Sequence, residues 1–283
     1  MAQIIKAPAK INIFLQILGD REDGFTEIIS LMQAVSLYDT IRVQRAERGL
    51  ELSSNEPSLP LDSSNTVAKA WAVMCAAVGK ELGAKIDIGK KIPMQSGLGG
   101  GSSDAAGAMI GIAREWGLKI DRETMKQLGA AVGSDVPFFF GGGSSLVEGR
   151  GEIVTDIAVP TDYALLLVKP PFGISTKDAY RRAKNGLTVG NKKRILNYLH
   201  QLTSISKLVE LGNALERPFF EAHPGAMEIK KKLLRAGAVA TALSGSGSCF
   251  FGVFENIDTA EIAKGKFKEF WRETALPAKM PEI

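Results

Sequence analysis

Apolar and polar residues alternate near the start of the chain, which predicts a half-buried strand. The odd-numbered residues of Ile11–Ile17 are apolar, whereas Lys10, Asn12 and Gln16 are polar. Successive side chains of a strand point to opposite faces. We therefore expect the apolar residues to share one face, and Lys10 and Asn12 to project together from the other.

A different spacing follows the Ser-, Pro- and Asn-rich stretch Ser53–Asn65. Val67, Trp71, Met74 and Val78 recur at intervals of four, three and four residues, which predicts an amphipathic helix over Thr66–Val78. Similar patterns predict strands at Thr40–Gln44, Lys85–Ile92, Ser145–Glu148, Tyr163–Val168 and within Ala240–Phe254. Further helices are expected from the glycine-rich segment to Trp116, and at Asp121–Gly133, Ser175–Tyr180, Asn191–Leu211, Pro224–Gly237 and Thr259–Arg272.

The order of these elements indicates an α+β fold in two domains. Strands and helices mix without the regular alternation of a doubly wound sheet. A length of 283 residues suits two cores better than one. Pro160 interrupts the pattern within Val154–Tyr163, so we expect domains over residues 1–157 and 158–283.

Composition narrows the possible functions. The chain is 45% hydrophobic and 23% charged with a net charge of +4, too weak and dispersed to indicate nucleic-acid binding. Two cysteines and two histidines give neither a disulfide framework nor a zinc site. There is no targeting signal and no membrane-spanning apolar run, so we expect a cytoplasmic protein. The sequence does not indicate an oligomeric state.

The segment Pro93–Ala106, PMQSGLGGGSSDAA, is the most informative stretch of the chain. It contains four glycines and runs into an alanine-rich helical pattern. Glycines let backbone N–H groups wrap an anion, and the following helix points its positive end at the same place. The segment therefore indicates phosphate binding, with a nucleotide as the leading ligand.

Two common phosphate motifs do not fit this segment. No Gly-Lys pair is followed by Ser or Thr, as a P-loop requires, and G-x-G-x-x-G does not close from Gly97 or Gly99. A flexible loop before a buried helix is the simpler alternative. Ser102, Ser103 and Asp104 are residues typical of a helix start, which favours the phosphate site.

Phosphoryl transfer also needs a cation and a group that handles the acceptor's proton. Lys10 is one candidate because it lies opposite the apolar face of its strand; the alternative is an ordinary surface lysine. Asp135, between Gly133 and Pro137, is the other, and its alternative role is to cap a turn. Ser246 and Ser248 could contact phosphate or simply form a hairpin turn.

Three motifs in this order make the chain similar to the GHMP kinase superfamily. They are the Lys-bearing N-terminal strand, PMQSGLGGGSSDAA, and LSGSGSCFF near the end. APAKINIFL, REDGFTEI, VGSDVPFF, KPPFGISTKDAY and GNALE further resemble one branch of it. That branch transfers phosphate from ATP to the 2-hydroxyl of a cytidyl diphosphate derivative of methylerythritol, in non-mevalonate isoprenoid precursor biosynthesis.

The resemblance implies a role for each matching position. Lys10 and Asp135 would be the catalytic pair, with Asp135 accepting or holding the acceptor's hydroxyl proton and Lys10 keeping Asp135 ionised. Asn65 and Thr176 would lie near adenosine. The ATP phosphates would be wrapped by Pro93, Met94, Gln95, Ser96, Gly97, Leu98, Gly99, Gly100, Gly101, Ser102 and Ser103.

The acceptor side of the resemblance includes one departure. Asn12 would contact the acceptor near the reacting hydroxyl, and Phe25 and Tyr180 would sandwich the cytosine. The family usually has Asp-Gly-Tyr-His where this chain has Asp23-Gly24-Phe25-Thr26. We therefore expect cytosine recognition to rely on the backbone of Thr26 and on the two rings.

The same resemblance implies a fold and a cofactor. The fold would pair an N-terminal domain like ribosomal protein S5 domain 2 with a ferredoxin-like C-terminal domain. Mg²⁺ is implied with ATP, with its protein ligands unknown; Ser103 and phosphate oxygens are candidates. Another GHMP-type kinase of small alcohols and a nucleotide-binding protein without catalysis are the alternatives.

Overall fold

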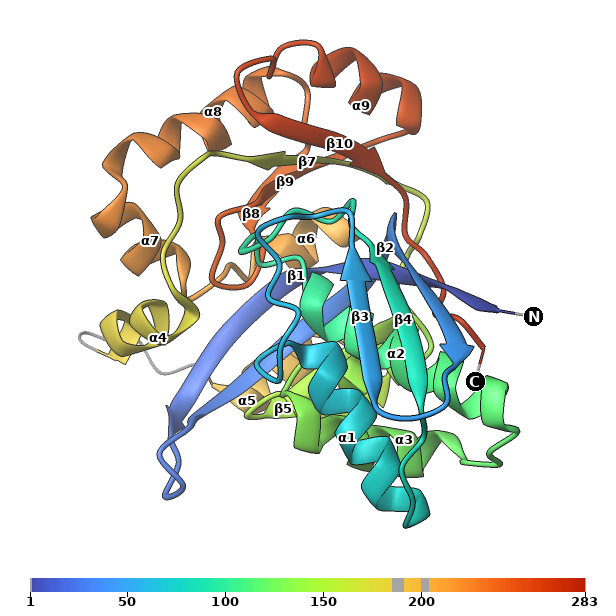
Figure 1. Cartoon of the computed structure of the whole chain (residues 1–283). Coiled ribbons are helices and arrows are strands. Elements are labelled where there is room, and N and C mark those ends of the chain that lie inside the picture. Colours follow the sequence, from blue (N-terminus) through green and yellow to red (C-terminus); the bar gives the residue numbers. More distant parts are fainter. Residues whose placement is uncertain (1, 185–190, 200–203, 283) are drawn as a thin grey trace.

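The computed structural model describes residues 2–184, 191–199 and 204–282, and they form two sheets with helices on their outer faces (Figure 1). The first half of the chain contains β1 Gln3–Asp20, β2 Thr26–Arg45, β3 Leu50–Ser54, α1 Thr66–Val78, β4 Ala84–Gly89, α2 Gly100–Trp116, α3 Arg122–Val132, η1 Pro137–Phe140, β5 Ser144–Gly149 and β6 Ile153–Asp156. β2 lies at the centre of this sheet, paired with β1, β4 and β5.

The second half builds a four-stranded antiparallel sheet in the order β10-β7-β9-β8. Its elements are β7 Ala164–Lys169, α4 Thr176–Lys184, α5 Lys192–Leu199, α6 Ile205–Val209, α7 Glu216–Ala222, η2 Pro224–Ala226, α8 Met227–Arg235, β8 Ala240–Leu243, β9 Phe250–Phe254, α9 Ile257–Lys264 and β10 Trp271–Ala275. The α+β prediction is confirmed.

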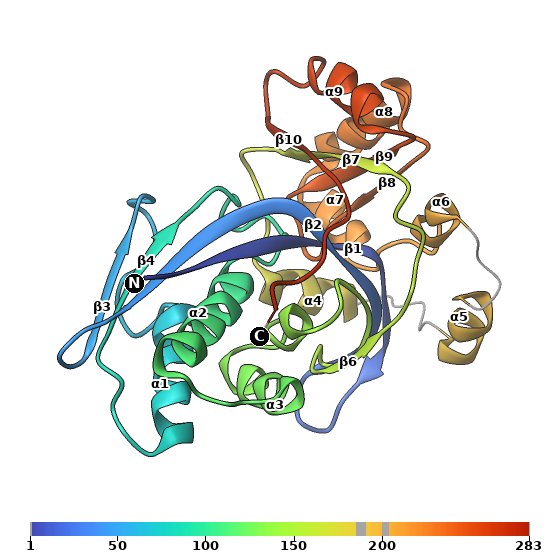
Figure 2. The ribbon, with the colours of Figure 1, turned by 90° about the vertical axis from the view of Figure 1, so that its right-hand side faces the viewer.

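The hairpin of β1 and β2 joins the two halves. Near the start of β1, Ile5 and Ala7 pack with α1 and α2 in one core. Further along the strand, Ile11 and Ile13 pack with β7 and β9 in a second core. Figure 2 shows α1, α2 and α3 on one side of this hairpin and the second sheet on the other. Because the hairpin is covered on both sides, most of its residues are buried.

The chain does not end in the second half. After β10, the backbone pairs Ser36 with Leu276 and Ala34 with Ala278, and Ala278 and Met280 pack on the first core. This last segment runs from the second sheet down to the first half of the molecule in Figure 2. The C-terminal residues therefore fasten the two halves together.

Some predicted elements need correction. Ile11 and Ile13 do not share a face with Leu15 and Ile17, which pack with α4, because a bulge between Asn12 and Phe14 shifts the register. The strand predicted at Thr40–Gln44 begins at Thr26, since a strand buried on both faces shows no alternation.

The predicted C-terminal helix Thr259–Arg272 is correct only in its first part. α9 ends at Lys264, and Trp271–Ala275 pairs with β7 as a sheet edge. The helical stretch Asn191–Leu211 includes α5 and α6, and residues 200–203 lie outside the described residues. Of the helices in the described ranges, none has the length and apolarity to cross a bilayer.

Candidate active site

A cleft of about 1130 Å³ lies between the two halves of the molecule. β1, the glycine-rich segment and the turn at Ser134-Asp135 line it from the first half. From the second half come α4 with the residues before it, and the turn at Gly245–Gly247. Five segments far apart in sequence thus meet around one space, and they include the three motifs that we expected to meet.

The glycine-rich segment opens directly into α2. Gly99 is the N-cap, with a φ of 72° and no side-chain cap hydrogen bond, and α2 begins at Gly100. Ser102, Ser103 and Asp104 therefore lie within the first turns and not at the cap, which corrects the expected helix start. Since no side chain caps α2, its first N–H groups are available to an anionic ligand in the cleft.

Two glycines in this segment are required by close contacts as well as by backbone conformation. A Cβ on Gly97, where φ is 75°, would lie 2.0 Å from the Ser244 carbonyl oxygen. A Cβ on Gly99 would lie 2.8 Å from Cγ of Lys10. The loop therefore lies in close contact with both β1 and the C-terminal glycine turn.

Lys10 and Asn12 point into the cleft together, as expected from their spacing. The Lys10 ammonium donates to Asn12 Oδ1 at 2.6 Å, and Asn12 Nδ2 donates to Ser30 Oγ. Lys10 is 3% exposed, so it is not an ordinary surface lysine. Gln16 does not join them, because its side chain donates to the Leu211 carbonyl.

Asp135 faces the same ammonium from the turn between α3 and η1. Its Oδ2 lies 3.5 Å from Lys10 Nζ, and its side chain is 34% exposed. The pair is thus an ion pair without a short hydrogen bond, and Asp135 keeps room to accept another donor. An exposed carboxylate beside a buried ammonium can accept a proton from a bound hydroxyl.

The C-terminal glycine turn closes the cleft over this pair. A Cβ on Gly245 would lie 3.3 Å from Asn12 Oδ1 and 3.4 Å from Lys10 Nζ. Asn213 Nδ2 donates to the Leu243 and Gly245 carbonyls, which fixes the turn. Ser246 lines the cleft, and its hydroxyl lies 3.0 Å from that of Thr176.

The far end of the cleft is aromatic. Phe25, Thr26 and Tyr180 all line it. Burial, and then the charge of Asp135, raise the pKa of the Tyr180 phenol. The Arg150 guanidinium stacks on the Phe25 ring at 4.9 Å and also lines the cleft. Sequence reasoning missed Arg150, because a lone arginine in a loop has no distinguishing pattern.

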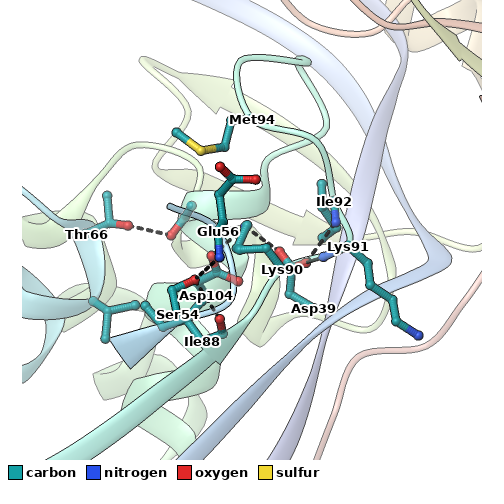
Figure 3. A network of polar contacts seen from close by, with 12 residues as sticks. Asp39, Ser54, Glu56, Thr66, Ile88, Lys90, Lys91, Ile92, Met94 and Asp104 are labelled. Carbon is teal, nitrogen blue, oxygen red and sulfur yellow. Dashed lines mark hydrogen bonds and ion pairs between the residues drawn. The ribbon is translucent and has the colours of Figure 1, made fainter. Parts of the chain in front are cut away.

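A second lysine–carboxylate cluster lies beside the glycine-rich segment (Figure 3). Lys90 Nζ donates to Asp39 Oδ2 at 2.5 Å and to Asp104 Oδ2 at 2.7 Å. Burial alone would lower the pKa of Lys90, but the charges of Asp104 and Asp39 outweigh it and raise that pKa. Burial, with the neighbouring charge of Asp39, raises the pKa of Asp104 to about 8 despite Lys90. The sequence analysis did not single out Asp39 or Lys90.

Three residues expected to bind ATP are placed outside the cleft lining. Asn65 accepts from Val67 N as the N-cap of α1 and donates to the Pro60 carbonyl. Leu98 is buried in the second core, and its carbonyl accepts from Lys10 N. Ser103 is 1% exposed. The neighbour of Asn65, Thr66, does line the cleft and donates to the Gly101 carbonyl.

A resident metal site is not apparent in the described part of the chain. It contains no group of three or more His, Cys, Asp or Glu side chains placed to bind a metal. Asp135 is the one carboxylate lining the cleft within those residues. Ser103 Oγ lacks a hydrogen-bond partner there, but it is buried away from the cleft. These residues fit a cation only if most of its ligands arrive with the substrate.

Comparisons with known proteins agree with this geometry. Family models described as "GHMP kinases N terminal domain" and "GHMP kinases C terminal" match residues 65–143 and 194–273. Two proteins named 4-diphosphocytidyl-2-C-methyl-D-erythritol kinase are each 39% identical to this chain. The one from Carboxydothermus hydrogenoformans aligns over 97% of this chain and 93% of its own length, and that from Thermodesulfovibrio yellowstonii over 94% of each.

A solved structure extends the likeness to the fold. A crystal structure of 4-(cytidine 5'-diphospho)-2C-methyl-D-erythritol kinase superposes with a TM-score of 0.78 at 28% identity. The match covers 98% of this chain and 100% of the other. The fold of nearly the whole chain is therefore shared with that kinase.

Proposed function

This chain belongs to the 4-diphosphocytidyl-2-C-methyl-D-erythritol kinases of the GHMP kinase family, and we propose that it phosphorylates the 2-hydroxyl of that cytidyl substrate with ATP. The geometric observation that carries the proposal is the Lys10–Asp135 pair, which lies beside the glycine-rich segment in one cleft. This step belongs to non-mevalonate isoprenoid precursor biosynthesis.

The donor binds on the glycine side. Backbone N–H groups from Gly97 to Ser102, at the positive end of α2, neutralise the ATP phosphates. Pro93–Ser96 form the wall before them, and Thr176 with Ser246 closes the cleft from the second half. Asn65 acts near the adenosine indirectly: it caps the N-terminus of α1 and so positions Thr66, which lines the cleft.

The acceptor binds on the aromatic side. Phe25 and Tyr180 stack on the cytosine, and the backbone of Thr26 hydrogen-bonds its edge. Asn12, fixed by Lys10 and Ser30, orients the acceptor near its reacting hydroxyl. This arrangement puts the 2-hydroxyl beside Asp135 and in line with the γ-phosphate.

Transfer then requires little movement. The hydroxyl proton passes to Asp135 while the hydroxyl oxygen bonds to the γ-phosphorus and the bond to the ADP oxygen breaks. The Lys10 ammonium offsets the carboxylate charge and keeps Asp135 oriented. Mg²⁺ arriving with ATP would supply charge neutralisation on the phosphates, and phosphate oxygens and water would be its main ligands.

The remaining assignments follow from this function. Residues 1–157 form the domain that binds the ATP phosphates, and residues 158–283 the domain that closes over them. The protein acts on small molecules and needs no nucleic acid or membrane. Its place is the cytoplasm, where ATP is abundant.

The acceptor specificity of the purified protein tests the proposal. ADP release is measured with Mg-ATP and the cytidyl substrate, homoserine or mevalonate in turn. We expect turnover with the cytidyl substrate at least 100-fold above the others, and a new phosphomonoester at the 2-position by ³¹P NMR. Equal turnover with another alcohol would favour a different GHMP-type kinase, and ATP binding without any turnover would favour a non-catalytic protein.

A further inference from the structure

Asp39 lies at the point where the two ends of the glycine-rich segment come together. It is on the central strand β2 and its side chain is fully buried. Its Oδ1 accepts from the backbone N–H groups of Lys91 and Ile92, at 2.5 and 2.8 Å. These residues directly precede Pro93, where the segment begins.

Asp39 reaches the other end of the segment through Lys90. Its Oδ2 accepts from Lys90 Nζ, which also donates to Asp104 in the first turns of α2. Figure 3 shows Lys90 between the two carboxylates, with Lys91 and Ile92 beside Asp39. One buried carboxylate therefore holds the start of the segment directly and its end through a lysine.

The bridge is rigid because its members are buried. The Lys90 and Asp104 side chains are 6% and 3% exposed, so water cannot easily replace their partners. A Cβ on Gly100, the first residue of α2, would lie 3.1 Å from Lys90 Nζ. Lys90 thus also lies close to the first residue of α2, where the backbone N–H groups face the cleft.

We propose that Asp39, Lys90 and Asp104 are positioning residues for ATP: they set the distance and angle between the two ends of the glycine-rich segment. This role rests on one part of the proposed function, namely that ATP is the phosphate donor, and it does not depend on which acceptor is used. An anion-binding loop gains affinity from being ordered before the ligand arrives. Loosening the bridge should weaken ATP binding and leave acceptor binding unchanged.

The three residues predict a graded response. Asp39→Asn replaces one accepting oxygen with an NH₂ group. That group either faces the Lys90 ammonium or takes the place of the oxygen that accepts from the Lys91 and Ile92 N–H groups, so one contact is lost in both orientations. The Kd for a non-hydrolysable ATP analogue should therefore rise about 30-fold. Asp104→Asn keeps an oxygen for Lys90 and leaves the start of the segment held, so the rise should be about threefold. Asp87→Asn, on the exposed face of β4, is the control and should leave the Kd unchanged.

The measurement is calorimetric binding of the analogue, with the KM of the cytidyl acceptor measured beside it and thermal unfolding to confirm that each variant is folded. A purely structural role would lower the unfolding temperature and the active fraction but not the Kd of folded protein. That result for Asp39→Asn, or an equal rise in Kd and acceptor KM, overturns the proposal.

A variant that keeps the charge covers the case in which Asp39→Asn does not fold. Lys90→Arg retains the cation but cannot reproduce a single ammonium shared between two carboxylates. It should raise the Kd about tenfold, and a Kd within twofold of wild type would contradict the proposal. Because the Kd of the ATP analogue is read without turnover, failure of the cytidyl acceptor as substrate would leave the Kd comparison among the variants intact.

Discussion

Among the residues that the structure describes, Lys10 and Lys90 have buried side chains that face carboxylates, and they differ in how completely they are paired. Lys90 lies between two buried carboxylates at hydrogen-bond distance, whereas Lys10 lies 3.5 Å from a carboxylate that is one-third exposed. Because the Lys90 ammonium donates to both of its carboxylates, its charge holds structure in place. A cluster with spare capacity can meet a substrate.

The largest expected effect on kcat comes from removing the cation of the Lys10–Asp135 pair. Lys10→Met leaves Asn12 Oδ1 without its donor and Asp135 without a counter-charge, so kcat should fall about 1000-fold. The measurement is steady-state ADP release. Lys85→Met, which removes an exposed lysine of β4, is the control, and an equal loss in both variants would contradict the distinction.

Gly99→Ala tests whether the glycine-rich segment must touch Lys10. The added Cβ would meet the Lys10 side chain and force a residue with φ of 72° to carry a methyl group. We expect kcat/KM for ATP to fall about 100-fold. Gly117→Ala is matched in backbone conformation, with φ of 63° and open space around it.

The control should therefore lose only stability, about 1 kcal/mol from the left-handed backbone. Activity losses of the same size in both variants would mean that backbone strain matters and contact with Lys10 does not.

Tyr180→Ala tests the acceptor end alone. Stacking of a base on an aromatic ring is worth about 1–3 kcal/mol, so the KM of the cytidyl acceptor should rise about 10- to 100-fold while the KM of ATP stays constant. Tyr198→Ala, on the exposed side of α5, should change neither constant. An unchanged acceptor KM in Tyr180→Ala would remove the cytosine sandwich from the account.

The last prediction concerns how the stability contributed by the Asp39–Lys90–Asp104 cluster depends on pH. The folded-state pKa of Asp104 is raised to about 8, above its unfolded value near 4. Its neutral form is favoured by folding, so its contribution to stability is full below pH 4 and is lost as pH rises toward 8. Compared with Asp104→Asn, wild type should lose stability between pH 4 and pH 8 in denaturant titrations. A difference that is independent of pH would contradict this.

Several helices and two residues of the site could be predicted from local sequence patterns. Thr66–Val78, the helix after the glycines and the cap at Asp121 match observed elements, because propensity and capping are local properties. The expectation that Lys10 and Asn12 project together is confirmed, because residues two positions apart on a strand lie on the same face.

What the sequence did not predict depends on long-range packing. The bulge after Asn12 and the edge strand Trp271–Ala275 are set by their partner strands. Asp39 is 51 residues from Lys90 in the chain, so no spacing rule joins them. The roles of the predicted site residues toward ATP and the acceptor stay predictions until ligands are bound.

The central claim is that Asp135 accepts the acceptor's proton while Lys10 keeps it in place. Single-turnover transfer from Mg-ATP to the cytidyl substrate tests this most directly, in wild type, in Asp135→Asn and in a control, Asp162→Asn, whose carboxylate is exposed. The account predicts a rate at least about 1000-fold lower in Asp135→Asn, with ATP and acceptor binding retained and Asp162→Asn unaffected. A rate within tenfold of wild type for folded, ligand-binding Asp135→Asn would contradict it.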